Sequence, residues 1–312
     1  MEMVNEKNSG NIILTTDFSE SADSACSYAA DEARKLKVGI DIVNVFDGPM
    51  LNVATYEYVP PMPLDEVLRQ EILDSLKAQL ENIKSKYFSD VSVQTHILDR
   101  KGNVGETVAQ YAVTSSSPLI VTSTHGQGFL TRSLLGSIAE QILHYAPCPV
   151  LMVPPSTQAV STATTYQNIV VPVDFSPSSK EALRAAVIKA QQQDAMLTIL
   201  HIVDESYLTK LFHSRTAEAV ASIQKSSNSY KDELDRRINE LARETGYTKT
   251  KGVVLKKEHS IPHTIAKFVQ SMPCPLIVIG TDRTVSKISL IGRVAERLSH
   301  QISCPMMLIP KK

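Results

Sequence analysis

The chain contains two copies of one sequence pattern. The phrase Asn11-Ile-Ile-Leu-Thr-Thr-Asp-Phe-Ser19 recurs as Asn168-Ile-Val-Val-Pro-Val-Asp-Phe-Ser176, 157 residues later. Ser-Pro-Leu-Ile-Val at 117–121 recurs as Cys-Pro-Leu-Ile-Val at 274–278, and the stretch 146–154 recurs at 302–310, one residue out of step. A repeat of this length is a whole domain. We therefore expect one domain over 1–155, a polar linker over 156–165 and a second domain over 166–312.

Each copy alternates short β-branched apolar runs with longer segments of helical period, a pattern typical of a parallel sheet covered by helices. In the first copy we expect strands near 11–16, 40–46, 91–98, 118–123 and 149–153. Ser19 and Ser176 are candidate N-caps, the latter followed by proline at the first helical position. Amphipathic helices are expected over 65–87 and 216–245. The predicted fold is α/β: two tandem Rossmann-like or flavodoxin-like domains, each a five-stranded, mostly parallel sheet flanked by helices.

Composition excludes several classes of protein. No apolar run approaches the roughly 18 residues that span a bilayer, and the first residues lack the basic and apolar regions of a signal peptide. The four cysteines form no CxxC pair, so the sequence gives little support for disulfides or a structural zinc site. Because disulfides are typical of exported proteins, a cytoplasmic location is expected. Nucleic-acid binding is not expected either, because aromatic residues make up 5% of the chain and the basic residues are scattered.

The net charge of −1 conceals a division between the halves. Residues 1–155 carry 11 basic and 19 acidic side chains, net −8, whereas residues 156–312 carry 21 and 14, net +7. This division either reflects random variation of solvated surface charge or causes the two halves to attract each other. With the apolar final strands 149–153 and 305–309, it predicts that the two domains pair as an internal pseudo-dimer; a homodimer is a further option.

The most informative stretch follows the fourth expected strand of the first copy. It reads Leu119-Ile-Val-Thr-Ser-Thr-His-Gly-Gln-Gly-Phe-Leu-Thr-Arg-Ser-Leu-Leu-Gly-Ser-Ile-Ala-Glu140, a strand, a glycine loop and a helix start. A helix N-terminus presents unpaired N–H groups, and glycines let the backbone approach a phosphate closely. The stretch therefore favours an anion. The alternatives are tight turns for the glycines and, for Ser137 with Glu140, a capping box.

The first copy resembles the universal stress proteins, whose ATP-binding members carry Gly-x2-Gly-x9-Gly-Ser after the fourth strand. Ser123-x2-Gly126-x9-Gly136-Ser137 departs from that motif only at its first residue. The opening phrase around Asp17 and the closing Ala-Pro-Cys-Pro-Val-Leu-Met-Val are also similar to the family, in both copies.

The resemblance implies an ATP-binding regulatory protein of the stress response, with ATP held by the first domain, alone or with Mg²⁺. It implies that Asp17 and the backbone of Val45 contact adenine and that Gly126, Gly136 and Ser137 hold the phosphates. Thr15, Thr16, Thr122, Ser123 and His125 would line the same cleft. The alternative for Asp17 is a turn residue before the first helix, and for His125 a solvent-facing loop residue.

The second copy breaks this motif within one loop. Arg283 stands where the second glycine belongs, only eight residues separate it from Gly292, and Arg293 replaces the serine. Asp174 and Gly280 keep their places. An arginine takes up space that a phosphate needs, yet its guanidinium also binds anions. We expect a degenerate second site without ATP.

No catalytic motif or metal site stands out. His259 and His263 have helical ligand spacing, but Pro262 lies between them. The alternatives to a nucleotide sensor are therefore a scaffold that binds protein partners without nucleotide, and a slow ATPase or autokinase.

Overall fold

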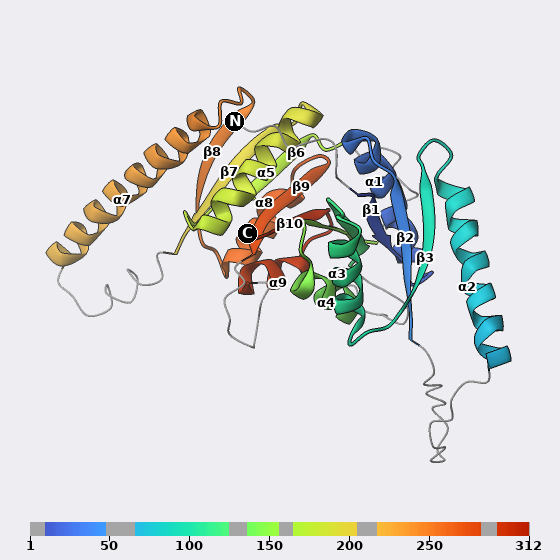
Figure 1. Cartoon of the computed structure of the whole chain (residues 1–312). Coiled ribbons are helices and arrows are strands. Elements are labelled where there is room, and N and C mark those ends of the chain that lie inside the picture. Colours follow the sequence, from blue (N-terminus) through green and yellow to red (C-terminus); the bar gives the residue numbers. More distant parts are fainter. Residues whose placement is uncertain are drawn as a thin grey trace, which may run out of the picture. The chain divides into compact units, whose positions relative to one another are not determined.

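The computed structural model describes residues 10–47, 66–124, 136–155, 165–204, 217–281 and 292–311, with the backbone alone over 217–228. The chain divides into two compact units, 1–164 (unit 1) and 165–312 (unit 2) (Figure 1). Within the described residues no helix combines the length and the apolar character needed to cross a membrane.

Unit 1 is an open parallel sheet with helices on both faces. Its elements are β1 (Ile12–Thr15), α1 (Glu20–Leu36), β2 (Ile40–Phe46), α2 (Glu66–Tyr87), β3 (Val93–Asp99), α3 (Val104–Thr114), β4 (Ile120–Ser123), α4 (Ser137–Tyr145) and β5 (Val150–Val153). The strand order is β3-β2-β1-β4-β5, with every neighbouring pair parallel. Helices α1 and α2 cover one face, and α3 packs on α4 over the other (Figure 1).

Unit 2 repeats this architecture. Its elements are β6 (Asn168–Pro172), α5 (Pro177–Gln193), β7 (Met196–Val203), α7 (Ala217–Glu244), β8 (Thr250–Lys256), α8 (Ile261–Gln270), β9 (Pro275–Thr281), α9 (Arg293–Ser299) and β10 (Met306–Pro310). The strand order β10-β9-β6-β7-β8 is again parallel throughout. The predicted tandem α/β fold is confirmed, while the pairing of the two domains stays a prediction.

The predicted helix starts are confirmed by the capping contacts. Ser19 accepts a hydrogen bond from the N–H of Ala22 at 3.2 Å, and Ser176 accepts one from the N–H of Ser179 at 3.2 Å. The predicted strand bounds were less accurate. The strand expected over 118–123 begins at residue 120, because Pro118 cannot donate to the ladder and Ser116 has φ of 53°.

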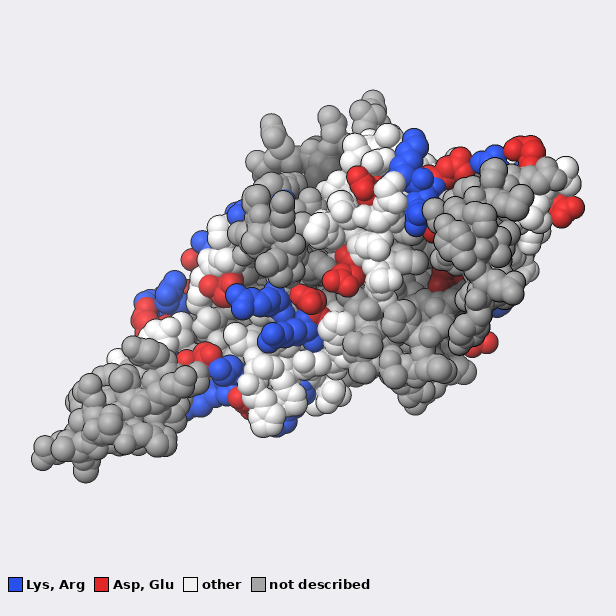
Figure 2. Space-filling view, turned by 90° about the horizontal axis from the view of Figure 1, so that it is seen from below, with Lys and Arg blue, Asp and Glu red and all other residues white. Residues whose placement is uncertain are grey.

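Much of the positive charge of unit 2 is neutralised locally. Arg236 contacts two carboxylates of its own helix, those of Glu233 and Glu240, at 2.7 and 2.5 Å. Lys267 contacts Glu258 at 2.8 Å. On the face in Figure 2, Lys and Arg side chains lie among Asp and Glu side chains. Exposed pairs of this kind contribute at most about 1 kcal/mol each to stability.

The core of unit 1 contains a buried carboxylate with several polar neighbours. Asp41 of β2 is 4% exposed. It accepts hydrogen bonds from Asn11 at 2.8 Å and from the Tyr111 hydroxyl at 2.9 Å, and His96 Nε2 lies 3.6 Å away. Burial and the negative charge of Asp41 raise the pKa of Tyr111 above its usual range.

Replacing Tyr111 by phenylalanine should lower the free energy of unfolding by about 1 to 2 kcal/mol at neutral pH, because Asp41 loses a donor. Since the folded-state pKa of Tyr111 is raised, its contribution is complete below pH 10 and is lost as the pH rises further. Urea unfolding from pH 7 to 11 should therefore show the wild-type advantage shrinking above pH 10. The exposed Tyr145→Phe is the control, and parallel pH profiles for wild type and Tyr111→Phe would contradict this account.

Candidate functional site

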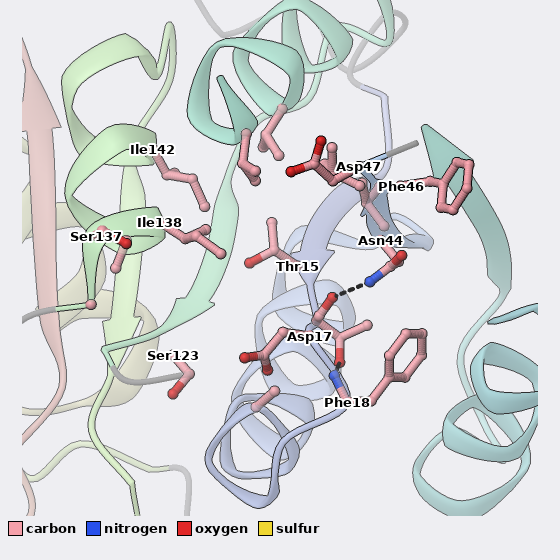
Figure 3. Close-up of a pocket in the computed structure, with 18 of the residues that line it drawn as sticks. Thr15, Asp17, Phe18, Asn44, Phe46, Asp47, Ser123, Ser137, Ile138 and Ile142 are labelled. Atoms are coloured by element: carbon pink, nitrogen blue, oxygen red, sulfur yellow. Dashed lines mark hydrogen bonds between the residues drawn. The ribbon is translucent and has the colours of Figure 1, made fainter. Parts of the chain in front are cut away.

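A cavity of about 470 Å³ lies in unit 1 at the carboxyl ends of β1, β2 and β4. The chain reverses its winding direction between β1 and β4, and open α/β sheets bind ligands at such a switch point. Helix α4 contributes Ser137, Ile138 and Ile142 to the wall (Figure 3).

Seven of the ten side chains or backbone positions predicted to bind nucleotide line this one cavity: Thr15, Thr16, Asp17, Val45, Ser123, Gly136 and Ser137. Thr122 does not line it. Its buried hydroxyl accepts a hydrogen bond from Thr15 at 2.9 Å, so Thr122 positions a wall residue. His125 and Gly126 lie outside the described residues.

Asp17 lies at the turn that links β1 to α1. Its Oδ1 accepts hydrogen bonds from the Ser19 N–H at 3.1 Å and the Ser19 hydroxyl at 2.6 Å, so it is a turn residue as well as a cavity residue. The next residue, Phe18, has φ of 63°, and Phe175 of unit 2 has φ of 64°. Bulky side chains rarely adopt this backbone region. Both units thus keep a strained turn beside the cavity.

Helix α4 begins at Ser137, and Gly136 precedes it with φ of −64°. The Gly136 N–H donates to the Thr124 carbonyl at 2.8 Å, which ties the helix start to the end of β4. The capping-box alternative for Ser137 is wrong, because Ser137 is the first helical residue and no side chain caps the helix. The N–H groups of the first turn of α4 therefore have no intrahelical acceptor. They lie next to Gly136, which lines the cavity.

Apolar walls from β2, α2, α3 and α4 complete the cavity, and the sequence reasoning did not identify them. The residues are Val43, Phe46, Ile72, Leu76, Val104, Val108, Ile138, Ala139 and Ile142. Asn44 was also missed. Its side-chain amide donates to the Thr16 carbonyl at 2.9 Å and holds the end of β1 against β2 (Figure 3). Its place at the carboxyl end of β2, beside Val45, is the signal that could have found it.

Unit 2 has a smaller cavity, about 240 Å³, at the equivalent place. Asp174, Gly280, Gly292 and Arg293 line it, whereas Arg283 lies outside the described residues. The hydrogen-bonded Thr15 and Thr122 of unit 1 are replaced by Pro172 and Ile279, and Asn44 is replaced by His201. His201 Nδ1 lies 2.7 Å from the Val173 carbonyl, so the larger imidazole takes over the contact that the amide makes in unit 1.

Among the described residues no group of three His, Cys, Asp or Glu side chains is arranged to hold a metal ion. The rings of His259 and His263 stack with their centroids 5.0 Å apart.

Comparison with known proteins identifies the same two repeats. The model of the universal stress protein family matches residues 8–154 and again residues 165–310. A universal stress protein of Mycolicibacterium smegmatis is 27% identical over 202 residues, which are 64% of this chain and 66% of that protein. One from Mycobacterium bovis is 24% identical over 206 residues, 61% of this chain and 63% of its own length. The chain thus spans just under two thirds of the length of these curated relatives.

The crystal structure of a universal stress protein from Archaeoglobus fulgidus aligns with 97% of this chain and 97% of its own length. Its TM-score is 0.60 at 16% identity, so the likeness shows the fold.

Proposed function

Because the chain belongs to the universal stress protein family, we propose that unit 1 binds ATP or a closely related adenine nucleotide and acts as a regulatory sensor. The observation that carries this proposal is the cavity itself. The cavity has apolar walls, and the start of α4, which no side chain caps, lies beside it. It lies at the switch point of a parallel sheet, where helix N–H groups can bind an anion.

The two parts of the cavity suit the two parts of a nucleotide. The apolar walls accept the faces of a planar base, and the Asp17 carboxylate is an acceptor for an exocyclic amine such as that of adenine. The N–H groups at the start of α4, with Gly136 and Ser137, suit phosphate oxygens.

Charge balance favours Mg²⁺ as a companion of the nucleotide. The described residues that line the cavity include the carboxylates of Asp17 and Asp47 and no lysine or arginine. A triphosphate next to two carboxylates is repelled unless a cation offsets the charge, and Mg²⁺ typically binds phosphates together with one or two carboxylates.

The test is to release small molecules from freshly purified full-length protein, identify them by mass spectrometry, and titrate the emptied protein with ATP and GTP by calorimetry. We expect an adenine nucleotide in the released fraction and one ATP per chain, because unit 2 has the smaller cavity with Arg293. GTP should bind at least about tenfold more weakly, because its 6-oxo group faces the Asp17 carboxylate.

If no nucleotide is released and calorimetry detects no heat of ATP binding, the partner-binding scaffold is favoured. Two ATP per chain would overturn the degenerate second site. Phosphate release during overnight incubation with ATP would favour the slow ATPase.

A further inference from the structure

The unit 2 cavity is chemically different from a nucleotide site. Its lining is mainly aliphatic, with polar groups from Ser176, Ser178, Ser179 and His201. The aliphatic side chains come from β7, β9, α8 and α9: Leu200, Ile202, Ile261, Ile265, Ile279, Val294 and Ala295. Where unit 1 places the hydroxyls of Thr15 and Thr122, unit 2 has Pro172 and Ile279. The ligand part that lies against these aliphatic side chains is therefore aliphatic, since a polar group there would lose its hydrogen bonds to water.

Two opposite charges lie at the exposed edge of this cavity. Asp174 follows the carboxyl end of β6, and Arg293 is the first residue of α9. Strand β6 is the neighbour of β9, which precedes α9, so both residues belong to one end of the sheet. Among the described residues neither side chain forms an ion pair, in a unit whose other basic side chains are often paired with carboxylates.

Asp174 is held in its charged form. Burial opposes ionisation, but hydrogen bonds from Ser176 and Ser179 outweigh it and lower the pKa of the Asp174 carboxyl. One of these bonds is from the Ser176 N–H to Oδ1 at 3.0 Å. At neutral pH the edge of the cavity thus carries one negative and one positive group.

We propose that the unit 2 cavity binds a free α-amino acid with an aliphatic side chain. The side chain would enter the apolar interior, with the ammonium group at Asp174 and the carboxylate at the Arg293 guanidinium. A cavity of about 150 Å³ lined by apolar side chains holds benzene, so 240 Å³ suits a ligand of about ten non-hydrogen atoms. Leucine and isoleucine fit this size.

The experiment is a methyl NMR titration of full-length protein carrying labelled isoleucine δ1 methyl groups. Three ligands of one shape are compared: leucine, 4-methylpentanoate, which lacks the ammonium group, and 3-methylbutylamine, which lacks the carboxylate. Leucine should shift Ile202, Ile261, Ile265 and Ile279 and leave Ile72 and Ile142 of unit 1 unchanged. Each of the other two ligands should bind about tenfold more weakly, because one charge-assisted contact is missing.

Two variants assign the charges separately. Asp174→Asn keeps the turn with Ser176 and should reduce leucine affinity to that of 4-methylpentanoate, with little effect on 4-methylpentanoate itself. Arg293→Gln should reduce leucine affinity to that of 3-methylbutylamine. The matched control is Arg297→Gln, because Arg297 is exposed on the same helix and does not line the cavity.

Three results would overturn the proposal. The first is the absence of isoleucine shifts in unit 2 at millimolar leucine. The second is equal affinity for the three ligands, which would make the cavity an apolar hole without charge recognition. The third is a shift of the same unit 2 methyl groups by ATP. Failure of ATP binding in unit 1 leaves the proposal intact, because its reporters and variants all lie in unit 2.

Discussion

Replacing Gly136 by arginine should lower the ATP affinity of full-length protein at least about 100-fold, a loss of nearly 3 kcal/mol of binding free energy. Gly136 is buried, lines the cavity and directly precedes α4. Its φ of −64° and ψ of 141° are open to any residue, so the backbone tolerates the change. Because Gly136 lines the cavity, the long side chain would compete with the phosphates for the space proposed for them.

Gly136→Ala is the matched control, because it makes the same backbone change and adds only a methyl group. We expect the alanine variant to retain ATP affinity within about threefold. Both variants should unfold close to the wild-type temperature by circular dichroism. Calorimetry that finds equal ATP affinity for wild type and Gly136→Arg would refute the placement of phosphates at the start of α4. If the arginine variant also loses its folded signal, Ser137→Arg at the exposed next position repeats the test.

Most of the fold was predictable from the sequence because the signals for helices and strands are local and each appears in both repeats. Ser19 and Ser176 begin equivalent helices with equivalent contacts. The C-caps Lys37 and Asp194, with φ of 55° and 53°, are also 157 residues apart. Hydrophobic period and capping chemistry both act within a few residues, so a single sequence reveals them.

The candidate site was only partly predictable because its apolar walls come from distant segments. Ile72 of α2 and Val108 of α3 come to line one cavity only after the sheet has formed. In the sequence they are ordinary core-facing positions of amphipathic helices. The role of Ser137 was misjudged for a related reason: the spacing to Glu140 fits a capping box, but the Gly136 contact with Thr124 sets the helix start one residue earlier than that box requires.

Replacing Gly105 by valine should destabilise unit 1 by about 3 kcal/mol and weaken ATP binding with it. A Cβ atom at Gly105 would lie 2.3 Å from the Gln141 carbonyl carbon and 2.5 Å from Gln141 Cβ, so α3 approaches the backbone of α4 directly. Glycine to alanine in a helix normally stabilises by about 0.5 to 1 kcal/mol. Overpacking against a backbone costs about 1 to 3 kcal/mol, so the steric effect wins.

The substitution should also affect the nucleotide site, because α4 begins at Ser137, beside the cavity. Moving α4 away from α3 displaces the N–H groups proposed to hold phosphate, so affinity and stability should fall together. Differential scanning calorimetry should show a midpoint about 6 to 12 °C lower for Gly105→Val and a smaller decrease for Gly105→Ala. Gln110→Val, on the exposed face of the same helix, measures the helix propensity of valine alone and should cost well under about 1 kcal/mol. A Gly105→Ala variant more stable than wild type would mean that α3 and α4 separate without cost, and that their close contact does not position the start of α4.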